Sequence, residues 1–323
     1  MERMLSIDEQ NYHYSSSSQI NIRKAVPRFL QIYAGIIPWV FLLGIIAAEL
    51  AVGFWSVSIG MALHVILLIA LLAMAVICWY YWDESSVENS HSRAVGQPVV
   101  SATDQKEQSA NARMWALYSY RLYLGLTLAP LIRILSLSIP LGNIDPQYFF
   151  LIPGIPLLAA AFTAARLAGY RMSDIYLAVR NRKNGHNWKV QFAVLFLGIP
   201  LGFMEYAILR PDPIIPVLTV GSVVTASFIL IIFTGLTEEM IFRGILKRSA
   251  DDFLGERVSI IYVSLLFAAL HITHLSALDV LFVFGVALLF SVIVHRTESL
   301  YGVVIAHGLT NINLFILGPH LFG

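Results

Sequence analysis

Long apolar segments recur throughout this sequence, and they constrain its fold more than any other feature. A helix needs about 20 mostly apolar residues to cross the hydrocarbon core of a bilayer. Nine segments meet this requirement: residues 29–50, 57–82, 115–139, 148–167, 190–209, 217–244, 258–274, 277–294 and 300–317. The pattern predicts an all-α protein, a polytopic transmembrane helical bundle of about nine spans.

The composition excludes several other classes of protein. Of the 323 residues, 58% are hydrophobic and only 13% are charged, against roughly 25% charged in an ordinary soluble domain. These values exclude a disordered protein, a soluble enzyme with a solvated surface and a protein that binds nucleic acid through charge. The single cysteine, Cys78, excludes an internal disulfide framework and a thiolate metal cluster.

The distribution of basic residues predicts the orientation of the chain. With the N-terminus inside, 18 of the 21 Lys and Arg residues fall on the cytoplasmic side. Only Arg210 falls on the opposite side, and Arg121 and Arg133 lie within the third span. By the positive-inside rule this split predicts an N-inside, C-outside topology.

Polar segments divide the chain into three parts. Residues 1–27 are predicted to be a polar N-terminal tail. Residues 28–146 form a three-span N-terminal extension that contains a polar linker at 83–112, and residues 147–323 form a six-span core. The basic stretch 170–188 fits either a short interfacial helix on the cytoplasmic leaflet or a plain loop.

Ionisable residues inside apolar spans are costly and are often functional. Five of them occur singly, and we interpret these as structural: Glu49, His64, Arg121, Arg133 and Glu205. His274 lies near the outer end of its span, and Asp279 heads the eighth span, on what we expect to be the far side from the polar clusters described next. Neither is predicted to take part in chemistry.

Three of the last four spans carry polar clusters instead. These are Thr237–Gly244 (TEEMIFRG), Phe267–His271 (FAALH) and His307–Asn311 (HGLTN). At a rise of about 1.5 Å per residue, Glu238 and His271 lie roughly 18–20 Å from the cytoplasmic ends of their helices, and the third cluster roughly 10–17 Å. The clusters are therefore predicted to meet, opening towards the cytoplasm.

The spacing within each cluster predicts which side chains act together. Glu239 and Arg243 are four residues apart on one helix, so they can form an ion pair. Glu238 is rotated by about 100° from Glu239, and we expect it to face His271. His307 and Asn311 project together and form a donor pair suited to an oxyanion.

A buried Glu beside a His can take a proton from water, and together with oxyanion donors this is the equipment for amide hydrolysis. Neither a G-x-S-x-G nor an H-E-x-x-H motif is present. Taken one by one, each cluster also fits polar contacts between helices. The functional interpretation is favoured because the structural one must explain three clusters independently.

These three motifs, in this order on successive spans, resemble those of the CAAX protease and bacteriocin-processing (CPBP, or Abi) family of intramembrane glutamic endopeptidases. The run EEMIFRG is similar to the family's EExxFRG, and the resemblance covers about residues 150–318. The family's T-G-S-L-W stretch stands here as TESLY, with Glu298 for glycine and Tyr301 for tryptophan. Both departures lie outside the three polar motifs.

The resemblance implies a role for each site residue. Glu238 corresponds to the residue that activates water, His271 assists it, and His307 and Asn311 stabilise the oxyanion. The positioning residues are Glu239, Arg243 and Phe267.

The resemblance also implies a peptide or protein substrate, which can be prenylated, and an active site open to the cytoplasm. We expect an integral multi-pass protein of a bacterial or archaeal cell membrane, with lipids and no nucleic acid among its partners. No cofactor motif is present, and the role of a divalent metal stays open because Glu, His and Asn side chains are available.

Two alternatives belong to other classes. The chain could be a non-catalytic membrane scaffold or a bacteriocin self-immunity protein that keeps the site for binding. It could also be an ion-coupled transporter with the carboxylates as a proton relay, although the absence of internal repeats argues against this.

Overall fold

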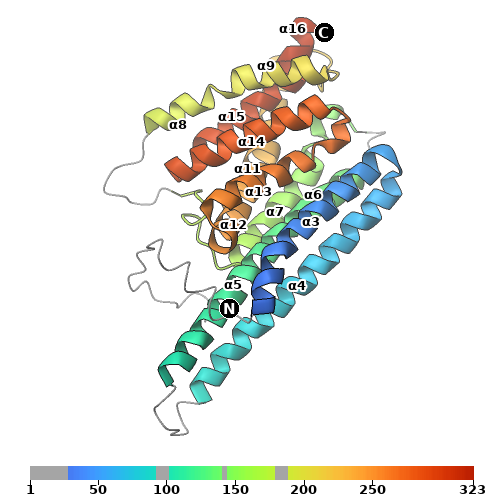
Figure 1. Ribbon diagram of the computed structural model, residues 1–323. Helices are drawn as coiled ribbons and strands as arrows, with labels where there is room; N and C mark the ends of the chain where they lie inside the picture. The colour runs from blue at the N-terminus through green and yellow to red at the C-terminus, as the bar shows by residue number, and fades with distance from the viewer. Residues whose placement is uncertain (1–27, 92–101, 140–143, 179–187) are drawn as a thin grey trace.

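The computed structural model describes residues 28–91, 102–139, 144–178 and 188–323. The regular elements of these residues are all helices, packed into one elongated bundle (Figure 1). The predicted tail, residues 1–27, lies outside the described residues, and so do residues 92–101 of the predicted linker.

Nine helical segments of the described chain are long and apolar enough to cross a membrane, which confirms the predicted count. They are Gly35–Phe54, Val57–Trp82, Arg113–Leu137, Pro146–Leu167, Trp188–Leu209, Val220–Leu254, Glu256–His274, Ala277–Thr297 and Tyr301–Phe322.

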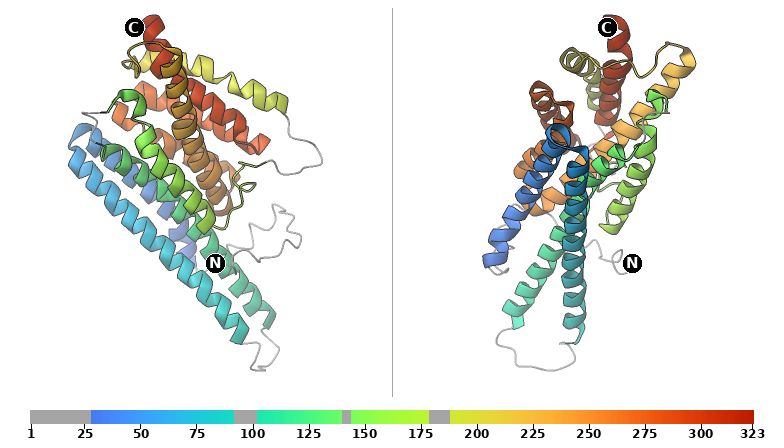
Figure 2. Two further views of the ribbon diagram at one scale, coloured as in Figure 1. Left: turned by 180° about the vertical axis from the view of Figure 1, so that it is seen from behind. Right: turned by 90° about the vertical axis from the view of Figure 1, so that its right-hand side faces the viewer.

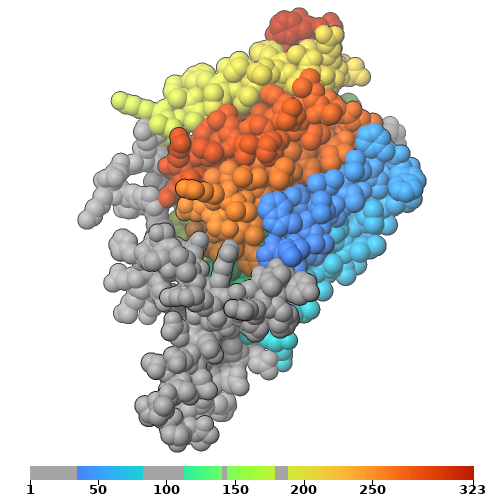
Figure 3. Space-filling view, viewed as in Figure 1, coloured from blue at the N-terminus to red at the C-terminus, as the bar shows by residue number. Residues whose placement is uncertain are grey.

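The first three spans form one side of the bundle. They comprise α3 (Arg28–Phe54), α4 (Val57–His91), α5 (Ala102–Leu126) and α6 (Leu128–Leu137), so α4 and α5 extend into both ends of the predicted linker. Apolar side chains point outwards along α3 and α4: Leu43 is 65% exposed and Ile66 is 60% exposed. Such a surface is the one that lipid tails cover. Figure 3 shows α3 lying against the orange helices of the core.

The core contains the remaining six spans. Its elements are η3 (Pro146–Tyr148), α7 (Leu151–Leu167), α8 (Trp188–Leu195), α9 (Gly198–Leu209), α10 (Val220–Ile229), η4 (Leu230–Leu236), α11 (Thr237–Glu239), η5 (Met240–Leu246), α12 (Lys247–Leu254), α13 (Glu256–Ala269), η6 (Ile272–His274), α14 (Ala277–Thr297), α15 (Tyr301–Ile312), η7 (Asn313–Leu317) and α16 (Gly318–Phe322).

The sixth span runs as one continuous helix (Figure 2). Two stretches of it are π-helical. The π segments η4 and η5 flank Thr237–Glu239, and the hydroxyl of Thr237 donates to the carbonyl of Ile232, five residues earlier, at 3.1 Å. π-Helical turns are rare in proteins, and those that occur are often found at functional sites. The helix ends at Gly255, whose φ of 86° suits glycine.

The described half of the basic stretch 170–188 is a series of turns, and residues 179–187 lie outside the description. Tyr170 and Ile175 are buried against the core, and the hydroxyl groups of Tyr170 and Ser249 lie 3.1 Å apart. Burial raises the pKa of Tyr170, so this hydroxyl stays protonated. Residues 170–178 thus pack as a folded connection and not as an interfacial helix.

Most of the five ionisable residues that occur singly in the sequence have polar partners in the structure. Glu49 Oε1 lies 3.3 Å from His64 Nε2 and 2.9 Å from Arg133 Nε. Arg121 donates to the carbonyl of Ala168 at 2.9 Å. Antiparallel packing of separate spans brings these groups together, and the distances between them along the chain give no sign of it.

Candidate active site

Two glycines bring the sixth and ninth spans into close contact. A Cβ atom at Gly235 would lie 2.8 Å from the carbonyl oxygen of Val304, and one at Gly308 would lie 2.9 Å from the Cα of Ile231. Small residues allow helix backbones to approach this closely in membranes. The crossing places α11 beside His307.

Glu239 is fully buried and joins two of the predicted clusters. Its Oε1 accepts from Arg243 at 2.9 Å and from His307 Nδ1 at 2.8 Å. The predicted ion pair with Arg243 is therefore present, whereas the bond to His307 was not predicted. An ionised carboxylate only accepts hydrogen bonds, so Nδ1 of His307 carries a proton. The other ring nitrogen, Nε2, points away from Glu239.

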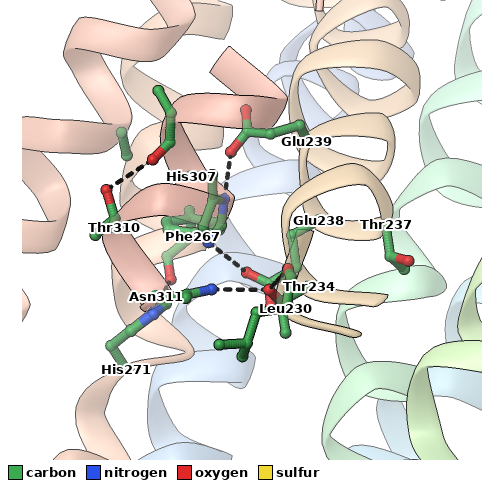
Figure 4. Close-up of polar contacts among 12 residues, drawn as sticks. Leu230, Thr234, Thr237, Glu238, Glu239, Phe267, His271, His307, Thr310 and Asn311 are labelled. Carbon is green, nitrogen blue, oxygen red and sulfur yellow. Dashed lines mark hydrogen bonds and ion pairs between the residues drawn. The ribbon is translucent and has the colours of Figure 1, made fainter. Parts of the chain in front are cut away.

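Glu238 differs from its neighbour in both exposure and partner. About 30% of its side chain is exposed, and its Oε2 lies 3.8 Å from Nε2 of His307 (Figure 4). The expectation that it faces His271 is not met: within the described residues no hydrogen bond joins the two side chains, and the ring beside the carboxylate is that of His307. The rotation of about 100° separates Glu238 from Glu239, but the ring that Glu238 meets depends on how the ninth span packs against α11.

His271 is held by the motif that contains it. Its Nδ1 lies 3.0 Å from the carbonyl oxygen of Phe267, and because a carbonyl only accepts, Nδ1 donates. In the neutral ring Nε2 is then an acceptor. The Phe267 ring lies 4.9 Å from the His271 ring and 4.4 Å from Cζ of Arg243. Phe267 therefore contacts two of the polar groups.

The side chain of Asn311 is oriented by the sixth span. Its amide donates to the hydroxyl of Thr234 at 2.8 Å, and that hydroxyl donates to the carbonyl of Leu230. An amide nitrogen has two N–H groups, so a second one is available for a ligand.

Glu239, His271, His307 and Asn311 meet at one cavity of about 40 Å³, which is large enough for at least one water molecule. Its polar lining consists of Glu205, Glu239, Arg243, His271, His307, Thr310 and Asn311, and Glu238 is not among the lining residues. The three motifs therefore converge, as the estimate of their depth predicted.

The model of the family described as type II CAAX prenyl endopeptidase Rce1-like matches residues 220–313. This segment is Rce1-like. It contains all three motifs, and the match confirms the resemblance drawn from the sequence. No curated protein and no solved structure matches the chain. The match makes this segment similar to CAAX prenyl endopeptidases, and the nine candidate spans indicate an integral membrane protein.

Glu205 lines the cavity from outside the Rce1-like segment, and the sequence interpretation missed it. It lies on α9 and is only 7% exposed. The available signal was the pair Gly198 and Gly202 on the same helix, which packs against α15 near Ala306 and Thr310. A lone Glu near the end of a span did not indicate a site by itself.

His274 and Asp279 also lie closer to the site than expected. Nδ1 of His274 is 2.8 Å from Oδ2 of Asp279, and the His274 ring is 5.2 Å from that of His271. The expectation that Asp279 lies far away is wrong because the connection between α13 and α14 is only a short 3-10 turn. Ser276 caps α14 by accepting from the Asp279 N–H at 3.2 Å.

The structure assigns no metal ligands. In the part of the chain that it describes, no group of three or more His, Cys, Asp or Glu side chains is arranged to hold a metal ion.

Proposed function

We propose that this protein is an intramembrane glutamic endopeptidase that hydrolyses a peptide bond of a membrane-associated or prenylated substrate. The observation that carries the proposal is the convergence of His271, His307 and Asn311 on one cavity, with the Glu238 carboxylate 3.8 Å from His307. The Rce1-like match supports the reaction class.

The proposed first step is attack by water. A water molecule held by Nε2 of His271 in the cavity gives one proton to the Glu238 carboxylate beside His307, while its oxygen bonds to the peptide carbonyl carbon. The carbonyl electron pair moves to oxygen, and a tetrahedral oxyanion forms. The partial exposure of Glu238 fits this role because its carboxylate must reach the water.

The oxyanion needs hydrogen-bond donors. Asn311 supplies its second N–H, and His307 supplies Nε2–H. His307 Nδ1 already donates to Glu239, so the ring must carry both protons to act in this way. When the intermediate collapses, the C–N bond breaks and Glu238 returns its proton to the leaving amine.

The test is peptide cleavage by the purified protein in detergent, with prenylated and unprenylated CAAX-type peptides, in the presence and absence of a chelator. Glu238→Gln keeps the shape of the side chain but removes the base, so we expect a loss of at least about 100-fold in rate. The matched control is Glu256→Gln, whose side chain is 68% exposed at the start of α13, and it should cleave normally. Normal cleavage by Glu238→Gln would overturn the proposal.

The comparison with and without chelator tests whether cleavage depends on a metal. The comparison of prenylated with unprenylated peptides tests whether cleavage depends on the prenyl group. Equal cleavage with and without chelator supports chemistry by protein groups alone, and loss of cleavage shows dependence on a metal. A cellular phenotype that survives Glu238→Gln supports the alternative of a non-catalytic scaffold or self-immunity protein.

We also propose that the site opens to the cytoplasm, with the N-terminus inside and the C-terminus outside. The excess of basic residues on one side of the nine spans supports this orientation. Reporter fusions to the two termini test it: activity of a cytoplasmic reporter at the C-terminus would contradict it.

A further inference from the structure

A buried cluster of ionisable groups connects the first three spans to the candidate active site. Glu49 on α3, His64 on α4 and Arg133 on α6 meet at Oε1 of Glu49, 3.3 Å from the imidazole and 2.9 Å from the guanidinium. Glu49 and His64 are fully buried, and the Arg133 side chain is 14% exposed. A charge buried within a membrane span persists only with partners, and it marks a functional candidate.

Arg133 has a second contact, and this one reaches the Rce1-like segment. Its Nη2 donates to the carbonyl of Leu270, while its Nε donates to Glu49. Leu270 is the C-cap residue of α13. The last carbonyls of a helix lack donors within the helix, and a cation there also interacts favourably with the helix dipole. Arg133 therefore caps the helix at the residue before His271.

The backbone departs from the α-helix at the residue that follows this cap. His271 has φ −96° and ψ 0°, and the turn Ile272–His274 begins after it. The α3 helix packs on the same turn, because a Cβ atom at Gly53 would lie 2.9 Å from Leu275. The first three spans thus contact the segment that carries His271 at two points.

We propose that Arg133, held in place by Glu49, is a positioning residue for His271 and acts through the Leu270 carbonyl. The inference rests on the proposed function, in which His271 helps to hold the attacking water. It gives the three N-terminal spans a role in the site even though they lie outside the Rce1-like segment.

The first test variant is Arg133→Lys. Lysine keeps the positive charge beside Glu49 but lacks the planar fork that reaches the carboxylate and the carbonyl together. A displaced catalytic group lowers kcat more than it changes KM, so we expect kcat to fall by about ten- to a hundredfold, with KM nearly unchanged. The matched control is Arg121→Lys, because Arg121 also donates to a backbone carbonyl but at Ala168. It should keep the wild-type kcat.

The second variant separates positioning from stability. The double change Glu49→Leu and Arg133→Met removes both buried charges together, so neither is left without its partner. Thermal unfolding should stay close to that of the wild type, whereas kcat stays low because Leu270 still lacks its donor. A double variant that folds and cleaves at the wild-type rate would overturn the proposal. This variant also decides the question if Arg133→Lys does not fold.

A spectroscopic arm distinguishes failure of this proposal from failure of the proposed function. The ring signals of ¹⁵N-labelled His271, assigned with His271→Gln, should shift in the Arg133 variants and not in Arg121→Lys. This readout needs no substrate. If the wild type cleaves no peptide, the proposed function fails while the spectra still test Arg133. Unchanged His271 signals in the folded Arg133 variants would refute the positioning role.

Discussion

Nδ1 of His307 lies 2.8 Å from Oε1 of Glu239, and this bond separates two adjacent carboxylates into different roles. Glu239 is fully buried and binds both His307 and Arg243, whereas Glu238 keeps 30% of its side chain exposed beside Nε2 of the same ring. A carboxylate bonded to one ring nitrogen determines which nitrogen carries the proton and how the ring is oriented. We therefore interpret Glu239 as the residue that orients His307 and Glu238 as the one that reacts.

Glu239→Ala should destabilise the protein and also lower its activity. It leaves Arg243 buried without its carboxylate, which typically costs about 3–5 kcal/mol. The measurement is unfolding of the purified protein in detergent. Glu239→Leu combined with Arg243→Met should recover stability but not cleavage, because His307 still lacks its acceptor. Wild-type stability of Glu239→Ala would contradict this assignment.

Thr234→Val should reduce cleavage through Asn311. The substitution removes the hydroxyl that accepts from the Asn311 amide at 2.8 Å, so the amide loses its fixed orientation. Asn311→Ala removes the donor itself, which costs about 100- to 1,000-fold in kcat for an oxyanion-hole residue, and Thr234→Val should fall between it and the wild type. Thr163→Val on α7 is the control, since that exposed hydroxyl bonds only to Ala159 within its own helix. Equal rates for Thr234→Val and Thr163→Val would argue against an oriented amide.

Gly308→Ala and Gly285→Ala should change stability in opposite directions. The added methyl group at Gly308 meets the backbone of Ile231 at the helix crossing, and such overpacking typically costs about 1–3 kcal/mol. At Gly285, in the middle of α14, nothing lies within 4 Å of an added Cβ atom. There alanine should stabilise the helix by about 0.5–1 kcal/mol. Unfolding midpoints of the two variants provide the comparison, and the same sign for both would contradict the close crossing.

Glu298→Gly should stabilise the protein without changing cleavage. Glu298 has a φ of 49°, a left-handed conformation that costs about 1 kcal/mol for a residue with a side chain. This conformation accounts for the glycine that the CPBP family's motif has at the position. Glu256→Gly, at the start of α13, should instead destabilise, because glycine has no such strain to relieve there. A lower unfolding midpoint for Glu298→Gly would show that side-chain contacts of Glu298 outweigh the strain.

The residues that gather at the site were largely predictable from local patterns. The spacing of Glu239 and Arg243 predicted their ion pair, which the structure contains at 2.9 Å. The estimated depths of Glu238, His271 and His307 predicted that their helices would bring them together. The partner of Glu238 was not predictable in the same way, because it depends on which ring the ninth span places beside α11.

The number of membrane spans follows from the sequence alone, since the thickness of the bilayer determines how long an apolar segment must be. Contacts between spans were decided only by the tertiary structure. Glu49 binds Arg133, 84 residues away, and Glu239 binds His307, 68 residues away. Neither pair lies on one helix, so the helical repeat cannot predict these contacts. The physical reason is that hydropathy records whether a segment prefers the apolar membrane interior or water, whereas the choice of partner depends on how closely two helices can approach, as at Gly235 and Gly308.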